Sequence, residues 1–143
     1  MRVNAFGLVG ALLTEARRLE ILNALSLLDT PADPQLDEVA QLSAQLLHTP
    51  VALISVLDRD RQWFKARVGT CLTETPLSLS LCEHALTSRD LVVIPDARRD
   101  SAYAKHPAVK GPLAVRFYAG APLVLHEGAA VGALCVVDVK PAS

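Results

Sequence analysis

Cysteine, carboxylate and histidine side chains come closest together around residue 82. Ser80-Leu81-Cys82-Glu83 fits a capping box, in which the Ser80 side chain caps a helix and Glu83 reaches back to it. Cys82 then lies in the first helical turn, where the helix dipole stabilises a thiolate. A free cysteine more often serves as a small buried apolar residue, and we favour that role for Cys82. His84 points to another side of this helix and is no obvious proton acceptor for the thiol.

The remaining cysteines and the histidines form no metal or disulfide pattern. Cys135 lies in an apolar segment and is expected in the core, whereas Cys71 lies in a loop where oxidants can reach it. Three cysteines without paired spacing are typical of a reducing, cytoplasmic location. The spacing between Cys82 and His84 is not one used for zinc. We predict no metal site, because the histidines are dispersed at His48, His84, His106 and His126.

The composition is that of one domain with its own core. The 143 residues are 51% hydrophobic and 20% charged, which excludes a disordered chain. The 14 basic and 15 acidic residues give a net charge of −1, and aromatic residues make up only 4%, so no nucleic-acid binding is predicted. No apolar run approaches the ~18 residues that a bilayer requires, so no membrane insertion is predicted.

Hydrophobic periodicity predicts two helices followed mainly by strands. Apolar residues at helical spacing indicate a helix over residues 11–28 and, after the N-cap Asp33 and Pro34, a second helix that ends near His48. A short helix begins near Ser80, and loops occupy residues 69–76 and 97–112. The order predicts an α+β fold with a mainly antiparallel sheet. The expected strands are residues 51–57, 62–68, 91–94, 115–125 and 130–137, with a hairpin turn at 126–128.

Two of these strands are apolar on both alternating sets of residues. Residues 51–57 and 131–137 both show this pattern, which predicts central strands covered on both faces. The two N-terminal helices can cover one face of the sheet. The short helix near Ser80 and the loop over residues 97–112 must then cover the other face.

Segments along the whole chain match a known family in order, at residues 18–22, 27–31, 52–58, 61–69, 81–86, 93–97, 116–123 and 131–138. Through these segments the chain resembles a GAF domain of the type found N-terminally in bacterial sensor histidine kinases and diguanylate cyclases. The resemblance extends from about Arg17 to Asp138 and implies an N-terminal extension (1–10), a single GAF domain (11–139) and a C-terminal tail (140–143). It implies a GAF-like (profilin-like) fold: a six-stranded sheet with helices on one face and, on the other, a pocket roofed by a short helix and a loop.

The resemblance implies a non-catalytic regulatory domain. Such domains bind a small molecule or dimerise, and they pass a conformational signal to a covalently linked kinase or cyclase output domain. Bilin-binding relatives place a histidine directly after the cysteine, whereas Glu83 separates Cys82 from His84 here. The Asn-Lys…Phe…Asp-Glu signature of cyclic-nucleotide GAF domains is also absent. No cofactor is therefore identified.

An enzyme on the same fold is an alternative. Free methionine-(R)-sulfoxide reductases resemble GAF domains and use cysteine thiolates, and Cys82 has the features that a thiolate needs. The positions of the three cysteines do not match the motif of that family. We therefore assign no catalytic residue.

Ligand candidates lie on the predicted central strands and on the roof. Small residues at Ser55, Ala119, Gly120 and Gly132 make room for a ligand. Arg116 can hold a carboxylate or phosphate with two hydrogen bonds, or it can pair with Asp96 or Asp100 and fix the long loop. We favour the pairing slightly. The candidate pocket residues are Ser55, Cys82, His84, Asp96, Tyr103, His106, Arg116 and Tyr118.

A stripe of mainly apolar residues on the first predicted helix could mediate dimerisation. This stripe can form a parallel seam with a second copy of the chain, which predicts a homodimer, or it can pack on the chain's own sheet. Both interpretations stay open at this point. The stripe consists of Leu12, Ala16, Leu19, Leu22 and Ser26.

Overall fold

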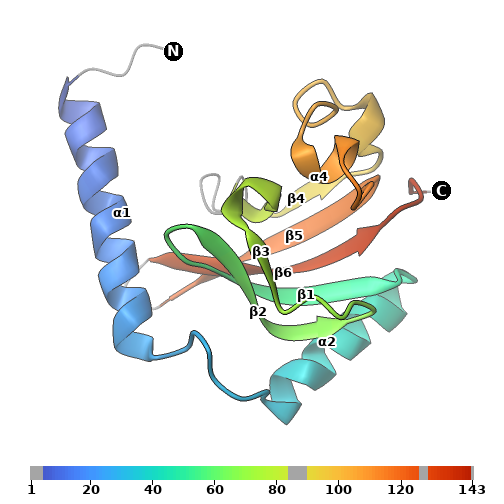
Figure 1. Cartoon of the computed structure of the whole chain (residues 1–143), viewed down its shortest axis with the longest axis horizontal. Helices are drawn as coiled ribbons and strands as arrows, with labels where there is room; N and C mark the ends of the chain where they lie inside the picture. Colours follow the sequence, from blue (N-terminus) through green and yellow to red (C-terminus); the bar gives the residue numbers. More distant parts are fainter. Residues whose placement is uncertain (1–4, 84–89, 126–128, 143) are drawn as a thin grey trace.

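In the described part of the chain, two long helices precede six strands (Figure 1). The computed structural model describes residues 5–83, 90–125 and 129–142, and their side chains from residue 15 onward. The helical elements are α1 (Ala5–Leu25), α2 (Pro34–Leu47), η1 (Leu77–Leu79), η2 (Ala97–Arg99) and α4 (Pro107–Lys110). The strands are β1 (Val51–Leu57), β2 (Arg61–Val68), β3 (Glu74–Pro76), β4 (Val92–Ile94), β5 (Phe117–Val124) and β6 (Ala130–Asp138).

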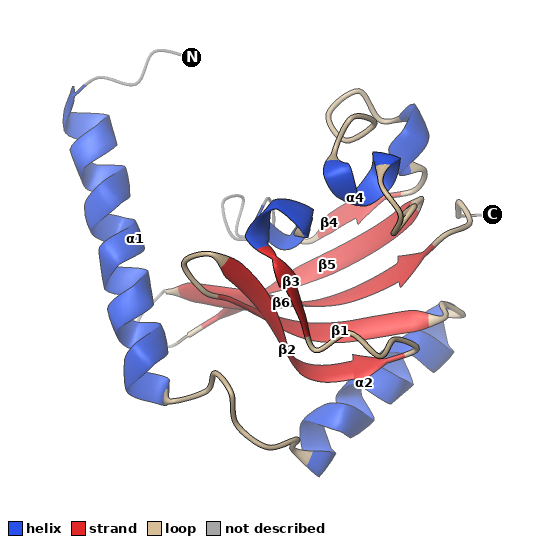
Figure 2. Cartoon of the chain, viewed as in Figure 1, coloured by secondary structure: helices blue, strands red, loops and turns tan. Residues whose placement is uncertain are grey.

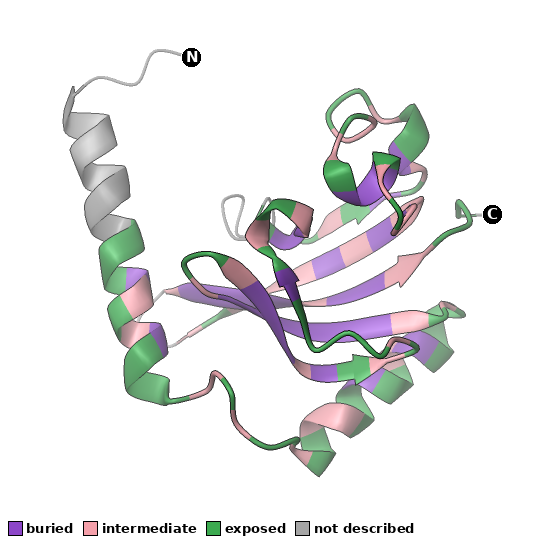
Figure 3. Cartoon of the chain, viewed as in Figure 1, coloured by how far each residue is buried: buried purple, intermediate pink, exposed green. Residues whose placement is uncertain are grey.

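The strands form one antiparallel sheet in the order β3-β2-β1-β6-β5-β4. β1 and β6 occupy its centre, and the register between them runs from Val51 opposite Val137 to Val56 opposite Gly132. Six consecutive residues of β1, from Ala52 to Leu57, are buried (Figure 3). The predicted α+β class, the antiparallel sheet and the two central strands are therefore confirmed.

The two long helices, α1 and α2, cover one face of this sheet, as expected (Figure 2). α2 packs on β1, β2 and β6, where Ala40 and Ala44 meet Ala52, Ile54 and Val136. The C-terminal half of α1 covers the neighbouring part of the same face. There Leu22 forms a second cluster with Val56, Trp63 and Val131.

Short elements cover the opposite face. Residues 81–82, η2 and α4 place small apolar side chains over Leu53 and Leu57 of β1 and Cys135 of β6. The loop predicted over residues 97–112 thus contains η2 and α4, and the loop over 69–76 contains β3. These elements are three or four residues long, which is too short for a hydrophobic period to reveal them. The covering residues are Leu81, Cys82, Ala97, Ala108 and Val109.

α2 has the boundaries that its sequence predicts. The Asp33 side chain accepts hydrogen bonds from the backbone N–H groups of Gln35 (2.9 Å) and Leu36 (3.4 Å), and Pro34 takes the first helical position. At the other end His48 adopts left-handed backbone angles (φ 53°, ψ 43°) that close the helix.

α1 differs from its predicted range of 11–28. It begins at Ala5 and ends at Leu25, because Ser26 turns into the left-handed region (φ 49°). Arg18 is buried although its side chain is charged. Its guanidinium donates to the Leu57 carbonyl (2.7 Å) and pairs with Glu15 (2.8 Å), which fixes α1 to the end of β1.

The helix expected near Ser80 and the turn expected at 126–128 lie partly or wholly outside the described residues. The Ser80 hydroxyl accepts a hydrogen bond from the Cys82 N–H (3.0 Å), and residues 82–83 are helical, which supports a helix start there. The rest of that expected helix and the turn at 126–128 lie outside the described residues. In the described part of the chain, no helix is both long and apolar enough to cross a membrane.

Replacing the α2 cap tests this account of the helix boundary. We expect Asp33→Ala to lower the free energy of unfolding by about 1 kcal/mol, because two backbone N–H groups lose their acceptor. Asp33→Asn is the matched control, since asparagine caps equally well and retains most of that stability. Urea denaturation at neutral pH measures both variants. Equal losses in the two variants would contradict the capping role.

Candidate functional site

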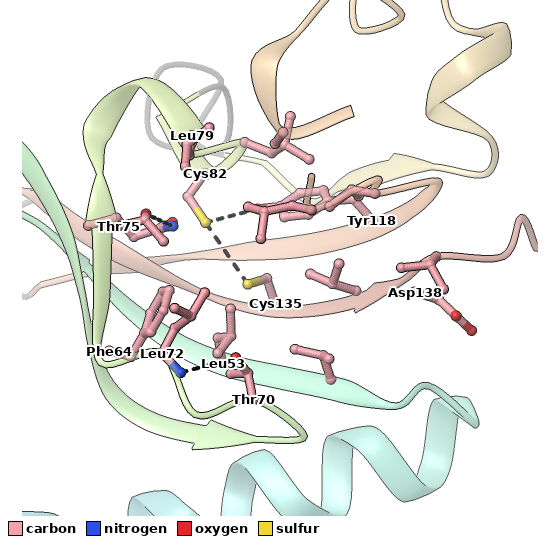
Figure 4. A pocket seen from close by; sticks show the side chains of 18 of the residues that line it. Leu53, Phe64, Thr70, Leu72, Thr75, Leu79, Cys82, Tyr118, Cys135 and Asp138 are labelled. Carbon is pink, nitrogen blue, oxygen red and sulfur yellow. Dashed lines mark hydrogen bonds between the residues drawn. The ribbon is translucent and has the colours of Figure 1, made fainter. Parts of the chain in front are cut away.

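A cavity of about 160 Å³ lies between the sheet and the short elements that cover it (Figure 4). β1 and β6 supply its floor through Leu53, Cys135 and Val137, and β2 supplies a side wall through Phe64. The walls are mainly apolar. The other lining residues are Pro50, Val51, Gln62, Thr70, Leu72, Thr75, Leu79, Leu81, Cys82, Ala108, Leu113, Val115, Tyr118, Asp138 and Val139.

A chain of buried hydrogen bonds runs along one wall of the cavity. The Gln62 side-chain amide donates to the Thr75 hydroxyl (3.1 Å), and the Ser80 hydroxyl donates to the Gln62 carbonyl oxygen (2.9 Å). The Ser80 hydroxyl in turn accepts from the Cys82 N–H. Because buried polar groups are costly without partners, these bonds hold β2, β3 and the segment carrying Cys82 in one arrangement.

Two thiols and a phenol meet at the end of this chain. The Tyr118 hydroxyl donates to the Cys82 sulfur at 3.2 Å, and the Cys82 and Cys135 sulfurs are 4.0 Å apart (Figure 4). Hydrogen bonding with Cys135, opposed by burial and aided by Tyr118, lowers the pKa of Cys82 to about 7. The same contact with Cys82, together with burial, raises the pKa of Cys135 well above its ordinary value. Burial raises the pKa of Tyr118, so the phenol keeps the proton that it donates.

The small residues that were expected to leave space for a ligand instead lie against other parts of the protein. A side chain at Gly120 would collide with the Tyr118 ring, which lies along the strand there. A side chain at Gly132 would collide with the backbone carbonyl of Ser55, because β1 and β6 approach closely. Ala119 belongs to the face that α2 covers. The empty space of the cavity lies instead beside Leu53, Val137 and Phe64.

The structure brings two of the predicted pocket residues to the cavity, Cys82 and Tyr118. Ser55 lies fully buried beside them, with its hydroxyl 3.9 Å from the Cys135 sulfur. His106 instead caps α4, since its Nδ1 accepts from the Ala108 N–H (3.0 Å). Tyr103 packs against the core on the roof side without lining the cavity.

Arg116 and Asp96 bind each other. The guanidinium donates to both carboxylate oxygens of Asp96 at 3.1 and 2.6 Å, while the Arg116 carbonyl accepts from the Ala97 N–H. This is the pairing that the sequence favoured over a bound anion, and it fixes the start of η2. His84 lies outside the described residues.

The predicted helix stripe is partly used within the domain. Leu22 is buried and Leu19 packs against the same cluster beneath β1 and β2. Ala16 is exposed. The side chain of Leu12 is outside the described set.

Several cavity residues escaped sequence reasoning. Gln62 and Phe64 share one face of β2, so strict alternation along that strand could have identified them as neighbours. The pairing of Cys82 with Cys135 carries no local signal, because 53 residues separate them. Among the described residues, no group of three or more His, Cys, Asp or Glu side chains is placed to hold a metal.

The family comparison matches this fold. The model of the GAF domain family matches residues 31–143, and the chain therefore belongs to the GAF domain family. A cyclic di-GMP phosphodiesterase of Pseudomonas aeruginosa is 39% identical over 127 residues, which cover 89% of this chain. The chain spans only 22% of that relative's length.

Solved structures share the fold at low sequence identity. The GAF domain of an Acinetobacter phosphoenolpyruvate-protein phosphotransferase superposes with a TM-score of 0.59 at 18% identity, covering 92% of this chain and 78% of that one. The type II free methionine-R-sulfoxide reductase of Thermoplasma acidophilum gives 0.57 at 22% identity, covering 76% and 74%. At these identities the likeness shows the fold alone.

The Arg116–Asp96 pair predicts a pH-dependent contribution to stability. Hydrogen bonding to Arg116 lowers the pKa of Asp96 below its ordinary value of 3.8. A carboxyl whose folded pKa is depressed stabilises the fold above its unfolded pKa and loses that effect as the pH falls through the folded pKa. We expect Asp96→Asn to be less stable than the wild type at pH 7, with a gap that narrows below pH 3.8.

Urea denaturation at a series of pH values measures that gap. Asp60→Asn, at an exposed position, is the control and should change stability little at any pH. A gap that stays constant between pH 7 and pH 3 would contradict a stabilising ion pair at Asp96.

Proposed function

We propose that this GAF domain is a non-catalytic sensory domain that binds a small neutral molecule in the cavity and regulates an attached output domain. The observation that carries the proposal is the cavity itself, which has apolar walls and a few hydrogen-bonding groups at fixed positions. Such a combination is typical of ligand sites. Gln62, Thr75 and Thr70 are the neutral polar residues that can orient a ligand there.

The size of the cavity limits the ligand. A volume of about 160 Å³ resembles that of engineered cavities of roughly 150 Å³, which accommodate benzene. A ligand of about that size fits without rearrangement of the walls. Haem, a bilin or a cyclic dinucleotide is far larger, so we do not propose one as the occupant.

The charge of the lining limits the ligand further. Asp138 is the one charged side chain among the described lining residues, and none of these is Lys, Arg or His. Arg116, the cation expected to hold an anion, is already paired with Asp96. An anionic ligand would therefore lose its hydration without gaining a countercharge, which favours a neutral molecule.

The absence of a cation among the described lining residues also weakens the reductase alternative. Free methionine sulfoxide is a zwitterion, and its carboxylate would need a cation that the described lining lacks. The relationship to the Thermoplasma reductase extends to the fold alone. A non-catalytic role is the better proposal.

The output is proposed from the family and from the relative. The P. aeruginosa relative is a cyclic di-GMP phosphodiesterase, and this chain corresponds to a part of it. We propose that the domain regulates a signalling output domain, such as a kinase or an enzyme of cyclic di-GMP turnover, in a cytoplasmic protein. Cys135, Val137 and Asp138 of β6 line the cavity, so a bound ligand would contact a central strand directly.

A cavity-filling variant tests the ligand proposal. Thermal-shift screening of small neutral metabolites should identify a compound that raises the wild-type melting temperature by roughly 5 °C or more at a hundredfold excess over Kd. Val137→Phe places a ring in the cavity and should abolish the shift. Val93→Phe is the matched control, because Val93 is exposed on β4 and outside the cavity, and it should retain the shift.

Two results would contradict the proposal. One is a compound that stabilises Val137→Phe as strongly as the wild type. The other is a wild-type protein that no metabolite of its host stabilises and that carries no bound molecule in native mass spectrometry.

Homodimerisation has a separate observation in its favour. Val39, Leu42 and Leu46 lie at helical spacing on α2 and are 42, 49 and 76% exposed. Exposed apolar side chains in a row mark interaction surfaces. Residues 39–47 carry no charged side chain, so two copies of this surface can meet without charge repulsion. We propose that α2 contributes to a homodimer, alongside exposed residues of α1 such as Ala16.

A charge on this surface tests the dimer. We expect the wild type to show a concentration-dependent dimer in light scattering coupled to size-exclusion chromatography. Leu46→Glu should raise the dissociation constant of this dimer at least tenfold. Leu91→Glu, at another exposed leucine, is the control and should leave the dimer intact. A wild-type monomer at all concentrations would contradict the proposal.

A further inference from the structure

Cys82 and Cys135 bring two thiols together in one wall of the cavity (Figure 4). Their sulfurs are 4.0 Å apart, although 53 residues separate them in the sequence. Both residues are almost fully buried, at 1 and 2% exposure. Cys71, the third cysteine, is exposed elsewhere. The cavity therefore holds a dithiol pair and excludes the third thiol.

The groups around the pair are polar where an inert core would be apolar. The Tyr118 hydroxyl donates to Cys82, and the Ser55 hydroxyl lies 3.9 Å from the Cys135 sulfur. The contact with Cys135 and the hydrogen bond from Tyr118 favour a thiolate at Cys82, whose pKa is lowered. The contact with Cys82 and burial raise the pKa of Cys135, which favours a protonated thiol there. A thiolate next to a protonated thiol is the arrangement that a nucleophile and its resolving partner need.

The cavity gives a small oxidant access to the pair. Both cysteines line it, as do Leu72 and Val139, which are 44 and 56% exposed and thus connect it to the surface. A space of about 160 Å³ admits a molecule the size of hydrogen peroxide. Burial also keeps other protein chains away from the two sulfurs, so that small molecules react with them.

We propose that Cys82 and Cys135 form a reversible thiol–disulfide switch that responds to small hydroperoxides. The Cys82 thiolate attacks one peroxide oxygen, the O–O bond breaks, and the departing alkoxide or hydroxide takes up a proton. This step oxidises Cys82 to the sulfenic acid and reduces the peroxide to an alcohol or water. The Cys135 sulfur then attacks the Cys82 sulfur, an S–S bond replaces the S–O bond, and water leaves with the proton of the Cys135 thiol. A dithiol reductant reverses the change by exchange.

Closing the disulfide changes the roof of the cavity more than its floor. An S–S bond is ~2.05 Å long, so the sulfurs must move about 2 Å closer together. Cys135 is held on the central strand β6 between β1 and β5, whereas Cys82 belongs to the segment above the sheet. The movement of Cys82 weakens its hydrogen bond from Tyr118 and pulls on the chain through Ser80 and Gln62. Oxidation thereby alters the cavity wall independently of any ligand.

Peroxide titration of the Cys71→Ser chain tests the switch. After treatment with hydrogen peroxide, denaturation and alkylation, we expect both remaining thiols to be lost together. The intact mass should fall by two hydrogen atoms, and peptide mapping should identify a Cys82–Cys135 crosslink. Dithiothreitol should restore both thiols. Two thiols that stay reduced at peroxide levels that oxidise Cys71 in the wild type would overturn the proposal, as would oxidation without this crosslink or without recovery.

Single-cysteine variants separate the two roles. In the same background, Cys135→Ser should stop at a Cys82 sulfenic acid that dimedone captures, whereas Cys82→Ser should leave Cys135 unreactive. Dimedone capture at Cys135 alone would reverse the assignment and overturn it. The titration of the Cys71→Ser chain needs neither variant, so the test survives if one of them fails to fold.

Tyr118 is a positioning residue in this proposal, and its readout is a pH profile. Tyr118→Phe keeps the ring and removes the donor, so the rate of thiol loss at pH 7 should fall about three- to tenfold and its midpoint should move to higher pH. An unchanged midpoint would overturn this role. Ligand screening is done in reducing buffer, so a failure of the ligand proposal and a failure of the switch are distinguishable.

Discussion

The antiparallel pairing of β1 with β6 is the interaction on which the other parts of the domain depend. The two backbones approach so closely at Gly132 that a side chain there would collide with the Ser55 carbonyl. Alternation then sends Leu53 and Cys135 toward the cavity and Ala52 toward α2. Because a shift of one residue would exchange these faces, the register of this pair determines both the helical layer and the cavity.

The cavity face combines apolar filling with satisfied polar groups. Leu81 and Val109 close the core from above, while Gln62 and Ser80 hydrogen-bond within it. Gly120 determines where the Tyr118 side chain lies, because the ring occupies the room that a side chain at Gly120 would need. In this position the Tyr118 hydroxyl reaches the Cys82 sulfur. The polar chemistry of the site therefore lies deep in the protein, whereas the Arg116–Asp96 ion pair lies at its edge.

The sequence predicted those features that depend on local pattern. The two central strands follow from apolar runs, and the start of α2 follows from Asp33 and Pro34. Burial of Arg18 could not be predicted, because its partner is the carbonyl of Leu57, 39 residues away. The same holds for Cys82 and Cys135, whose contact depends on how the roof meets the sheet. Elements as short as α4 are fixed by tertiary contacts and leave no periodic trace.

The two thiols of the proposed redox switch lie in the wall of the cavity that is proposed to bind a ligand. A molecule in the cavity would contact Cys135 on the fixed strand and Cys82 on the segment above it. A ligand that fills this space would also hold a peroxide away from the sulfurs, while a disulfide would change the shape that the ligand meets. Since each event alters the free energy of the other, occupancy and oxidation must be thermodynamically linked if both occur in this cavity.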